Sequence, residues 1–178
     1  MKEFLKKIKL IENFTIEIEF KKNDFVSKLK EHVDEGSIGL FANAFDVFSS
    51  SKNEYKGHVS YDEFKIKRRK RFFDMNKNLA IARGSYKQKN ETLIIETEIN
   101  GFNRIMIPYF LFTIVFYLIF IGVIIMTDSF KGIEVGFVFL FLFIHATFMF
   151  GIPYFLMRRS TKRMKYELER DFYYLTKK

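Results

Sequence analysis

The alternation of hydrophobic and polar positions divides the chain into a mixed region, two apolar runs and a charged tail. Residues 1–104 combine short apolar stretches with many charges, and residues 158–178 are again highly charged. Between them, 105–126 and 135–157 contain no Asp, Glu, Lys or Arg. Each apolar run exceeds the roughly 20 residues that a helix needs to cross the ~30 Å hydrocarbon layer. The pattern predicts a transmembrane hairpin with an external loop at 127–134.

The mixed region predicts a small α+β domain. Apolar and polar residues alternate from Asn13 to Phe20, which is typical of a half-buried strand. Phe25, Val26 and Leu29 then recur at helical spacing. From Gly57 onward, short strand-like runs separated by polar turns indicate an antiparallel meander. We therefore expect an antiparallel sheet of about five strands with one helix.

Residues 36–56 leave two interpretations open. Large apolar residues such as Phe41 and Phe45 alternate with Gly, Asn and Ser. The segment is interpreted as an irregular cover over the sheet. The alternative is that the 36–51 loop encloses an apolar pocket for a lipid or another small ligand, because long loops are uncommon unless they are functional.

The tail has the pattern of an amphipathic helix. Met164, Leu168, Phe172 and Leu175 recur at helical spacing between charged residues. This apolar stripe is compatible with a place on the membrane surface, against the soluble domain, or against a partner protein.

The distribution of charge predicts how the hairpin is oriented in the membrane. The chain has a formal net charge of +9, and basic residues crowd the end of the second apolar run, whereas the external loop has a single Lys. Lys and Arg accumulate on the cytoplasmic side of membrane proteins. Both termini are therefore expected in the cytoplasm, in a multi-pass protein of the cell (inner) membrane. The segment Met1–Leu10 lacks the continuous apolar region of a cleaved signal peptide, so export of the first domain is not expected.

The densest basic run lies between Lys65 and Arg71. It is interpreted first as a solvated strand and turn, and second as a surface for anionic lipid headgroups. Nucleic acid is the least favoured partner, because no recognisable nucleic-acid-binding fold or aromatic platform is present. The candidate membrane-surface contacts are Lys65, Lys67, Arg68, Arg69, Lys70, Arg71, Arg158, Arg159, Lys162 and Arg163.

His145 is the one conventional acid or base inside the predicted spans. In an antiparallel hairpin it falls at about the depth of Tyr117, so the two residues form a candidate interhelical pair. A proton relay would need further ionisable groups, and the spans contain none. Pro153 lies within the second span and is expected to bend its helix near Met149.

The sequence does not indicate a familiar enzyme class. It has no Cys, which excludes disulfides and thiolate metal sites. No Gly-rich phosphate loop, HExxH motif or nucleophile elbow is present. No cofactor, metal or catalytic residue is predicted.

Three stretches resemble a group of uncharacterised small bacterial membrane proteins that share this layout of a soluble domain followed by two spans. The stretches are Phe45–Gly57, Phe64–Arg69 and Leu93–Asn100. The resemblance implies the architecture and no particular activity. The sequence as a whole favours a membrane-anchored protein whose cytoplasmic domain is a binding or scaffolding module, with a lipid- or ligand-binding protein as the alternative. Other membrane proteins or a second copy of the chain are further candidate partners.

Overall fold

The computed structural model describes the whole chain except residues 40–50, 70–78, 127–132 and 178. It forms two compact units, and α5, the last helix, contributes to both. The first unit consists of Met1–Phe102 together with Met157–Lys178, and the second of Asn103–Leu156.

The first unit is built on a mixed six-stranded sheet with the strand order β1-β6-β5-β4-β3-β2. All neighbouring strands are antiparallel except β2 and β3, which are parallel. The prediction of an α+β domain is confirmed. The expected antiparallel sheet of about five strands was wrong in one respect, because the sheet has a sixth strand, β2, which is parallel to β3. Its three residues are too few to show an alternating pattern in the sequence. The strands are β1 Ile11–Glu19, β2 Val33–Glu35, β3 Tyr55–Val59, β4 Glu63–Arg68, β5 Ile81–Lys89 and β6 Thr92–Asn100.

Four helices have described bounds. They are α1 Lys2–Lys7, α2 Lys22–His32, α4 Met106–Met126 and α5 Ile133–Thr176. The apolar runs become α4 and the first part of α5, and α5 continues without interruption into the tail. The loop 127–134 lies largely outside the described residues, and α5 already begins at Ile133.

The core of the first unit lies between one face of the sheet and the helices α2 and α5. Phe25 of α2, Phe64 of β4 and Phe172 of α5 are completely or almost completely buried. The Phe172 ring makes edge-to-face contacts with Phe25 and Phe64, at centroid distances of 5.4 and 5.7 Å. Such pairs contribute beyond the area that they bury. A residue from the tail is therefore at the centre of the core.

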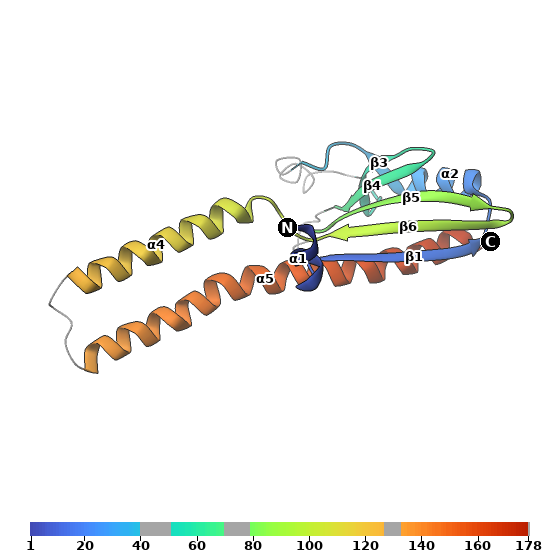
Figure 1. The fold of residues 1–178 in the computed structure, drawn as a ribbon. Coiled ribbons are helices and arrows are strands. Elements are labelled where there is room, and N and C mark those ends of the chain that lie inside the picture. The colour runs from blue at the N-terminus through green and yellow to red at the C-terminus, as the bar shows by residue number, and fades with distance from the viewer. Residues whose placement is uncertain (40–50, 70–78, 127–132, 178) are drawn as a thin grey trace. The chain divides into compact units, whose positions relative to one another are not determined.

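The tail, expected as a helix over residues 158–178, is the last part of α5 and packs against the sheet (Figure 1). The four residues of its apolar stripe are all buried in the same core as the sheet residues. The chain beyond β6 also approaches α5 closely. A Cβ atom on Gly101 would lie 2.0 Å from Thr161 Oγ1, so only glycine fits between the sheet and the helix. Of the three places left open for the stripe, the structure shows the one against the soluble domain.

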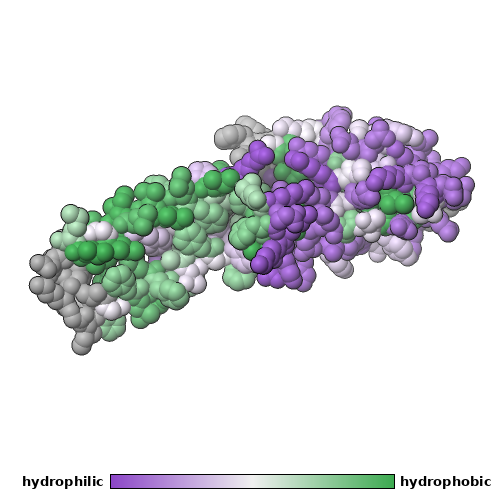
Figure 2. Space-filling view, in the orientation of Figure 1, coloured by the Kyte–Doolittle hydropathy of each residue, from purple (hydrophilic) through white to green (hydrophobic). Residues whose placement is uncertain are grey.

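The second unit is an apolar pair of helices with its side chains turned outward. α4 and the segment of α5 from Gly136 are long and apolar enough to cross a membrane. Leu111, Phe112 and Phe143 are 62, 74 and 73% exposed. Hydrophobic residues cover this unit, whereas hydrophilic residues cover the visible face of the first unit (Figure 2).

Candidate functional site

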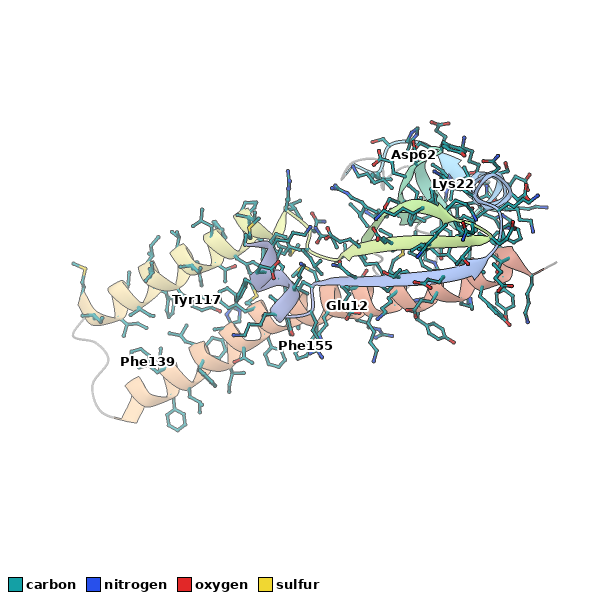
Figure 3. All side chains as sticks on the ribbon, turned by 45° about the vertical axis from the view of Figure 1, so that its right-hand side comes forward. Glu12, Lys22, Asp62, Tyr117, Phe139 and Phe155 are labelled. Atoms are coloured by element: carbon teal, nitrogen blue, oxygen red, sulfur yellow. The ribbon has the colours of Figure 1, made fainter. Side chains whose placement is uncertain are left out.

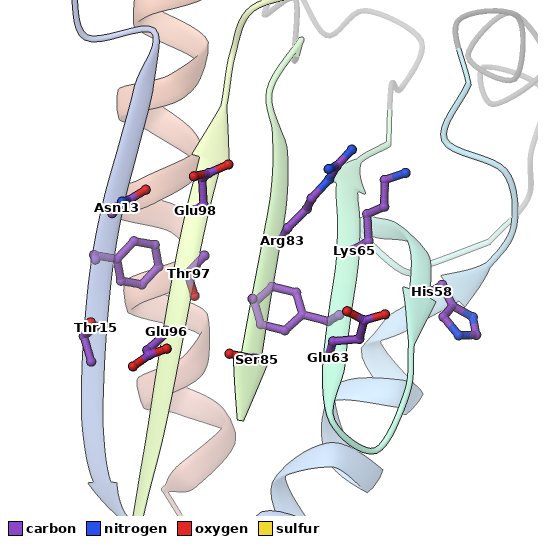
Figure 4. A pocket seen from close by; sticks show the side chains of 13 residues that line it. Asn13, Thr15, His58, Glu63, Lys65, Arg83, Ser85, Glu96, Thr97 and Glu98 are labelled. Carbon is purple, nitrogen blue, oxygen red and sulfur yellow. The ribbon is translucent and has the colours of Figure 1, made fainter. Parts of the chain in front are cut away.

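The exposed face of the sheet presents three basic side chains in one row across adjacent strands. His58 of β3 lies directly opposite Lys65 of β4, and Lys65 lies directly opposite Arg83 of β5. We call His58, Lys65 and Arg83 the basic row. Lys65 and Arg83 extend side by side in the same direction (Figure 4). Lys65 and Arg83 are like charges opposite each other, which destabilises a sheet, whereas Glu98 of β6 lies opposite Arg83 on its other side.

An acidic row runs parallel to the basic row. Glu63 lies opposite Ser85, and Ser85 lies opposite Glu96. Glu63 and Ser85 are two residues along their strands from Lys65 and Arg83, and Glu96 is two residues from Glu98, which lies opposite Arg83. At 3.2–3.4 Å of rise per residue, the two rows are about 7 Å apart along the strands.

Together the two rows line an open cavity of about 650 Å³. This volume lies in the range of small-molecule sites. Lys65 and Arg83 supply positive charge at one side of the cavity, where Glu98 also lies, and Glu63 and Glu96 supply hydrogen-bond acceptors at the other.

The ion pairs around the cavity leave two of its cations unpaired. Lys2 Nζ lies 2.6 Å from Glu98, and Lys87 Nζ lies 2.8 Å from Glu96. By contrast, neither Lys65 nor Arg83 has a side-chain hydrogen bond or an ion pair with any residue that the structure describes. His58 Nδ1 lies 3.1 Å from a carboxylate oxygen of Glu35.

The basic run of the sequence does not form one surface. Lys65 is exposed, whereas Lys67 and Arg69, which were also candidate lipid contacts, are buried at 5 and 8% exposure. Arg69 turns inward because it pairs with Asp34 of β2. Lys70 and Arg71 lie outside the described residues.

Arg68, also in that run, turns toward α5 and pairs with Glu167. Arg163 Nε donates to the same Glu167 oxygen at 2.6 Å, so Arg163 is a structural residue as well. Glu167 is only 6% exposed. Of the candidates in the tail, Arg158, Arg159 and Lys162 are exposed.

A second cavity of about 520 Å³ lies between α2, β3 and the end of α5. Leu29, Tyr55 and Phe172 give it an apolar lining. Tyr55 Oη donates a 2.6 Å hydrogen bond to Asp171. Burial and this carboxylate raise the pKa of Tyr55 far above its ordinary value, so the hydroxyl stays protonated and remains a donor. Charged residues of both signs surround the opening: Lys28, Lys52, Arg170, Glu31, Glu54 and Asp171.

In the second unit, the structure brings the candidate pair Tyr117 and His145 together. Tyr117 extends from α4 toward α5 (Figure 3), and its hydroxyl lies 2.6 Å from His145 Nδ1. The His145 ring also stacks on Phe141 within α5 at a centroid distance of 5.9 Å. These contacts join the two helices at one level.

A further polar contact in this unit, between Tyr109 and Met149, was not predicted. Pro153 has no N–H, so the carbonyl of Met149, four residues earlier, loses its usual helical partner. The Tyr109 hydroxyl of α4 donates to this carbonyl at 3.1 Å. An unpaired backbone carbonyl is costly in apolar surroundings, and the hydrogen bond from Tyr109 removes that cost. Pro153 was visible in the sequence, but the residue that compensates for it was not.

The comparisons with known proteins give no assignment. No family model, curated protein or solved structure matches the chain. Among the described residues, no group of three or more His, Asp or Glu side chains is placed to hold a metal ion. The site is therefore interpreted from its own geometry.

Proposed function

We propose that this chain is a membrane-anchored protein of the cell (inner) membrane, and that its sheet domain is a binding or scaffolding module on the cytoplasmic surface. The observation that supports this most is the outward-facing apolar surface of α4 and the first part of α5. Water does not tolerate an apolar surface of this size on a monomer, whereas lipid does.

The connections between strand and span support a binding module that works near the headgroups. β6 ends at Asn100 and α4 begins at Met106. The five residues between them reach at most about 18 Å when fully extended. The exposed Arg158, Arg159 and Lys162 follow the second apolar run and favour a cytoplasmic C-terminus.

The anchoring is tested by extraction and topology. The full chain is expected to stay with membranes in alkaline carbonate, and reporters fused after Lys178 and near Lys131 are expected to report the cytoplasmic and the external side. Release by carbonate would contradict the anchor. A translocated C-terminus would contradict the orientation.

The binding role is tested by purification in mild detergent and identification of the proteins and lipids that co-purify. A partner that is retained by the full chain, and lost when the exposed sheet face is altered, would support a binding module. Retention of the same partners after that change would contradict this role for the sheet.

The second cavity favours the alternative function, a lipid- or small-ligand-binding membrane protein. Its volume and apolar lining suit a small amphipathic molecule. The sequence placed such a pocket under residues 36–51, of which 40–50 lie outside the described residues. Mass spectrometry of the gently purified protein would support the alternative if a stoichiometric small molecule is bound, and a ligand-free protein would count against it.

A further inference from the structure

Lys65 and Arg83 of the basic row lie opposite each other without an ion pair to any described residue, although Glu98 lies opposite Arg83 on its other side. Lys65 of β4 lies between His58 of β3 and Arg83 of β5, so its neighbours on both adjacent strands are basic. Exchange of either Lys65 or Arg83 for an uncharged residue would relieve the repulsion. Neither residue contributes a side-chain ion pair to the described part of the protein. Two adjacent cations that line an open cavity and have no ion pair favour a ligand with the opposite charge.

The chemistry of the row favours phosphate. An Arg guanidinium presents several N–H donors in a planar fork that matches phosphate oxygens, and a Lys ammonium supplies a strong point charge. Both side chains extend in the same direction along the sheet (Figure 4). The Ser85 hydroxyl of the acidic row adds a neutral donor to the same cavity.

The acidic row makes the site selective among phosphate compounds. Glu63 and Glu96 would repel a second anionic group, and they would accept hydrogen bonds from hydroxyl or ammonium groups. A ligand that spans both rows, whose backbone positions are about 7 Å apart, therefore combines a phosphate with a hydroxyl or ammonium donor. Phosphate esters of polyols or amino alcohols have this composition.

We propose that the exposed sheet face binds a phosphate ester, with Lys65 and Arg83 at the phosphate and Glu63 and Glu96 at its hydroxyl or ammonium donors. This proposal rests on the proposed function, because it names the ligand class of the same binding surface. The phosphate ester belongs either to a phospholipid headgroup or to a soluble molecule.

Calorimetric titration of the full chain in an uncharged detergent tests the proposal. The probes are glycerophosphoglycerol, its short-chain lipid counterpart dihexanoylphosphatidylglycerol, and inorganic phosphate. We expect the esters to bind more tightly than inorganic phosphate. The double variant Lys65→Gln/Arg83→Gln is expected to weaken ester binding about tenfold or more, since two charge-assisted contacts are lost.

The matched control removes two exposed Lys charges elsewhere, in Lys30→Gln/Lys89→Gln. The control is expected to keep its affinity within about twofold, since it lowers the net charge equally without touching the rows. The thermal midpoint of Lys65→Gln/Arg83→Gln without ligand is expected to equal or exceed that of the parent protein, because repulsion is removed. A variant that fails to fold would itself overturn the proposal, since it would show that the two cations stabilise the sheet.

The remaining outcomes separate the sources of the ligand. Binding of both esters that depends on the basic row supports a soluble phosphate ester, and binding of the lipid alone supports a headgroup. Absence of binding to either ester, or equal loss in the two double variants, overturns the proposal. Failure of the proposed function would be seen in a different experiment, as release of the chain from membranes by carbonate. That result would not change the titration.

Discussion

At the residue scale, the polar side chains of α4 are matched to polar groups of α5. The Tyr109 hydroxyl donates to the Met149 carbonyl, which lacks a backbone donor because of Pro153. The Tyr117 hydroxyl is hydrogen-bonded to His145. Both tyrosines belong to α4, and both partners lie on α5. The helix pair is thus specified by two hydrogen bonds within an otherwise apolar surface.

Tyr109→Phe is expected to destabilise the helix pair by about 1 kcal/mol, because the Met149 carbonyl then has no donor. Denaturant titration of the purified protein in micelles measures the loss. In a Pro153→Ala background, residue 153 regains its N–H and bonds to Met149, so the same substitution is expected to cost much less. Equal losses in the two backgrounds would show that Tyr109 does not compensate for the proline.

Tyr117→Phe and His145→Phe are expected to be coupled by about 0.6 kcal/mol, the usual size of an interhelical hydrogen bond in a membrane protein. The double-mutant cycle with the variant that carries both substitutions measures this coupling. A coupling near zero would mean that the 2.6 Å contact does not join the helices in solution.

At the element scale, α5 is joined to the sheet by a buried ion pair as well as by its apolar stripe. Glu167 of α5 accepts from Arg68 of β4 and from Arg163 of its own helix. Glu167→Gln is expected to lower the free energy of unfolding by about 2 kcal/mol, because Arg68 loses the buried one of its two carboxylate partners, Glu167 and Glu54. Thermal and denaturant unfolding of the full chain check this value.

Arg163→Gln is the control for that substitution. The Arg163 side chain is 32% exposed, against 17% for Arg68, and its loss leaves the Arg68–Glu167 pair in place. The control is therefore expected to cost much less than Glu167→Gln. If both variants lose the same stability, the contact between strand and helix contributes little.

The local hydrophobic pattern predicted most helices and strands, but it did not predict which strands lie side by side in the sheet. The alternation from Asn13 to Phe20 predicted a strand, which β1 confirms, and the apolar runs predicted the long helices. Alternation identifies which side chains share a face, but it does not identify the strand that lies beside them. β2 was missed because three residues carry no measurable period.

The candidate site was only partly predictable for the same reason. Lys65 was identified from a run of basic residues, but the described residues of that run point to different places. Lys65 is exposed, Arg68 pairs with Glu167 of α5, and Arg69 pairs with Asp34 of β2. His58 and Arg83 stand apart in the sequence and join Lys65 only through the strand register. The sequence shows His58 and Arg83 only as isolated basic residues in two strands. They indicate a shared site only when the register with Lys65 is known.

At the scale of the whole molecule, the tail completes the first unit. Removal of residues 158–178 is expected to unfold the sheet domain, because Phe172 and its neighbours on the stripe leave the core open. Limited proteolysis of the membrane-bound protein measures the loss as rapid cleavage within residues 1–102. Removal of Lys177 and Lys178 alone is the control, and the domain is expected to remain resistant. A truncated protein with a resistant sheet would contradict the structural role of the tail.

The place of α5 after the sheet in the sequence also determines the order of events during synthesis. Ribosomes add about 5–20 residues per second, so residues 103–178 need roughly 4–15 seconds after the last strand has been made. During that interval the sheet still lacks Leu168 and Phe172. The strands are therefore made well before they reach their native packing, and in the proposed membrane protein the hairpin would be inserted before the domain that it anchors has matured.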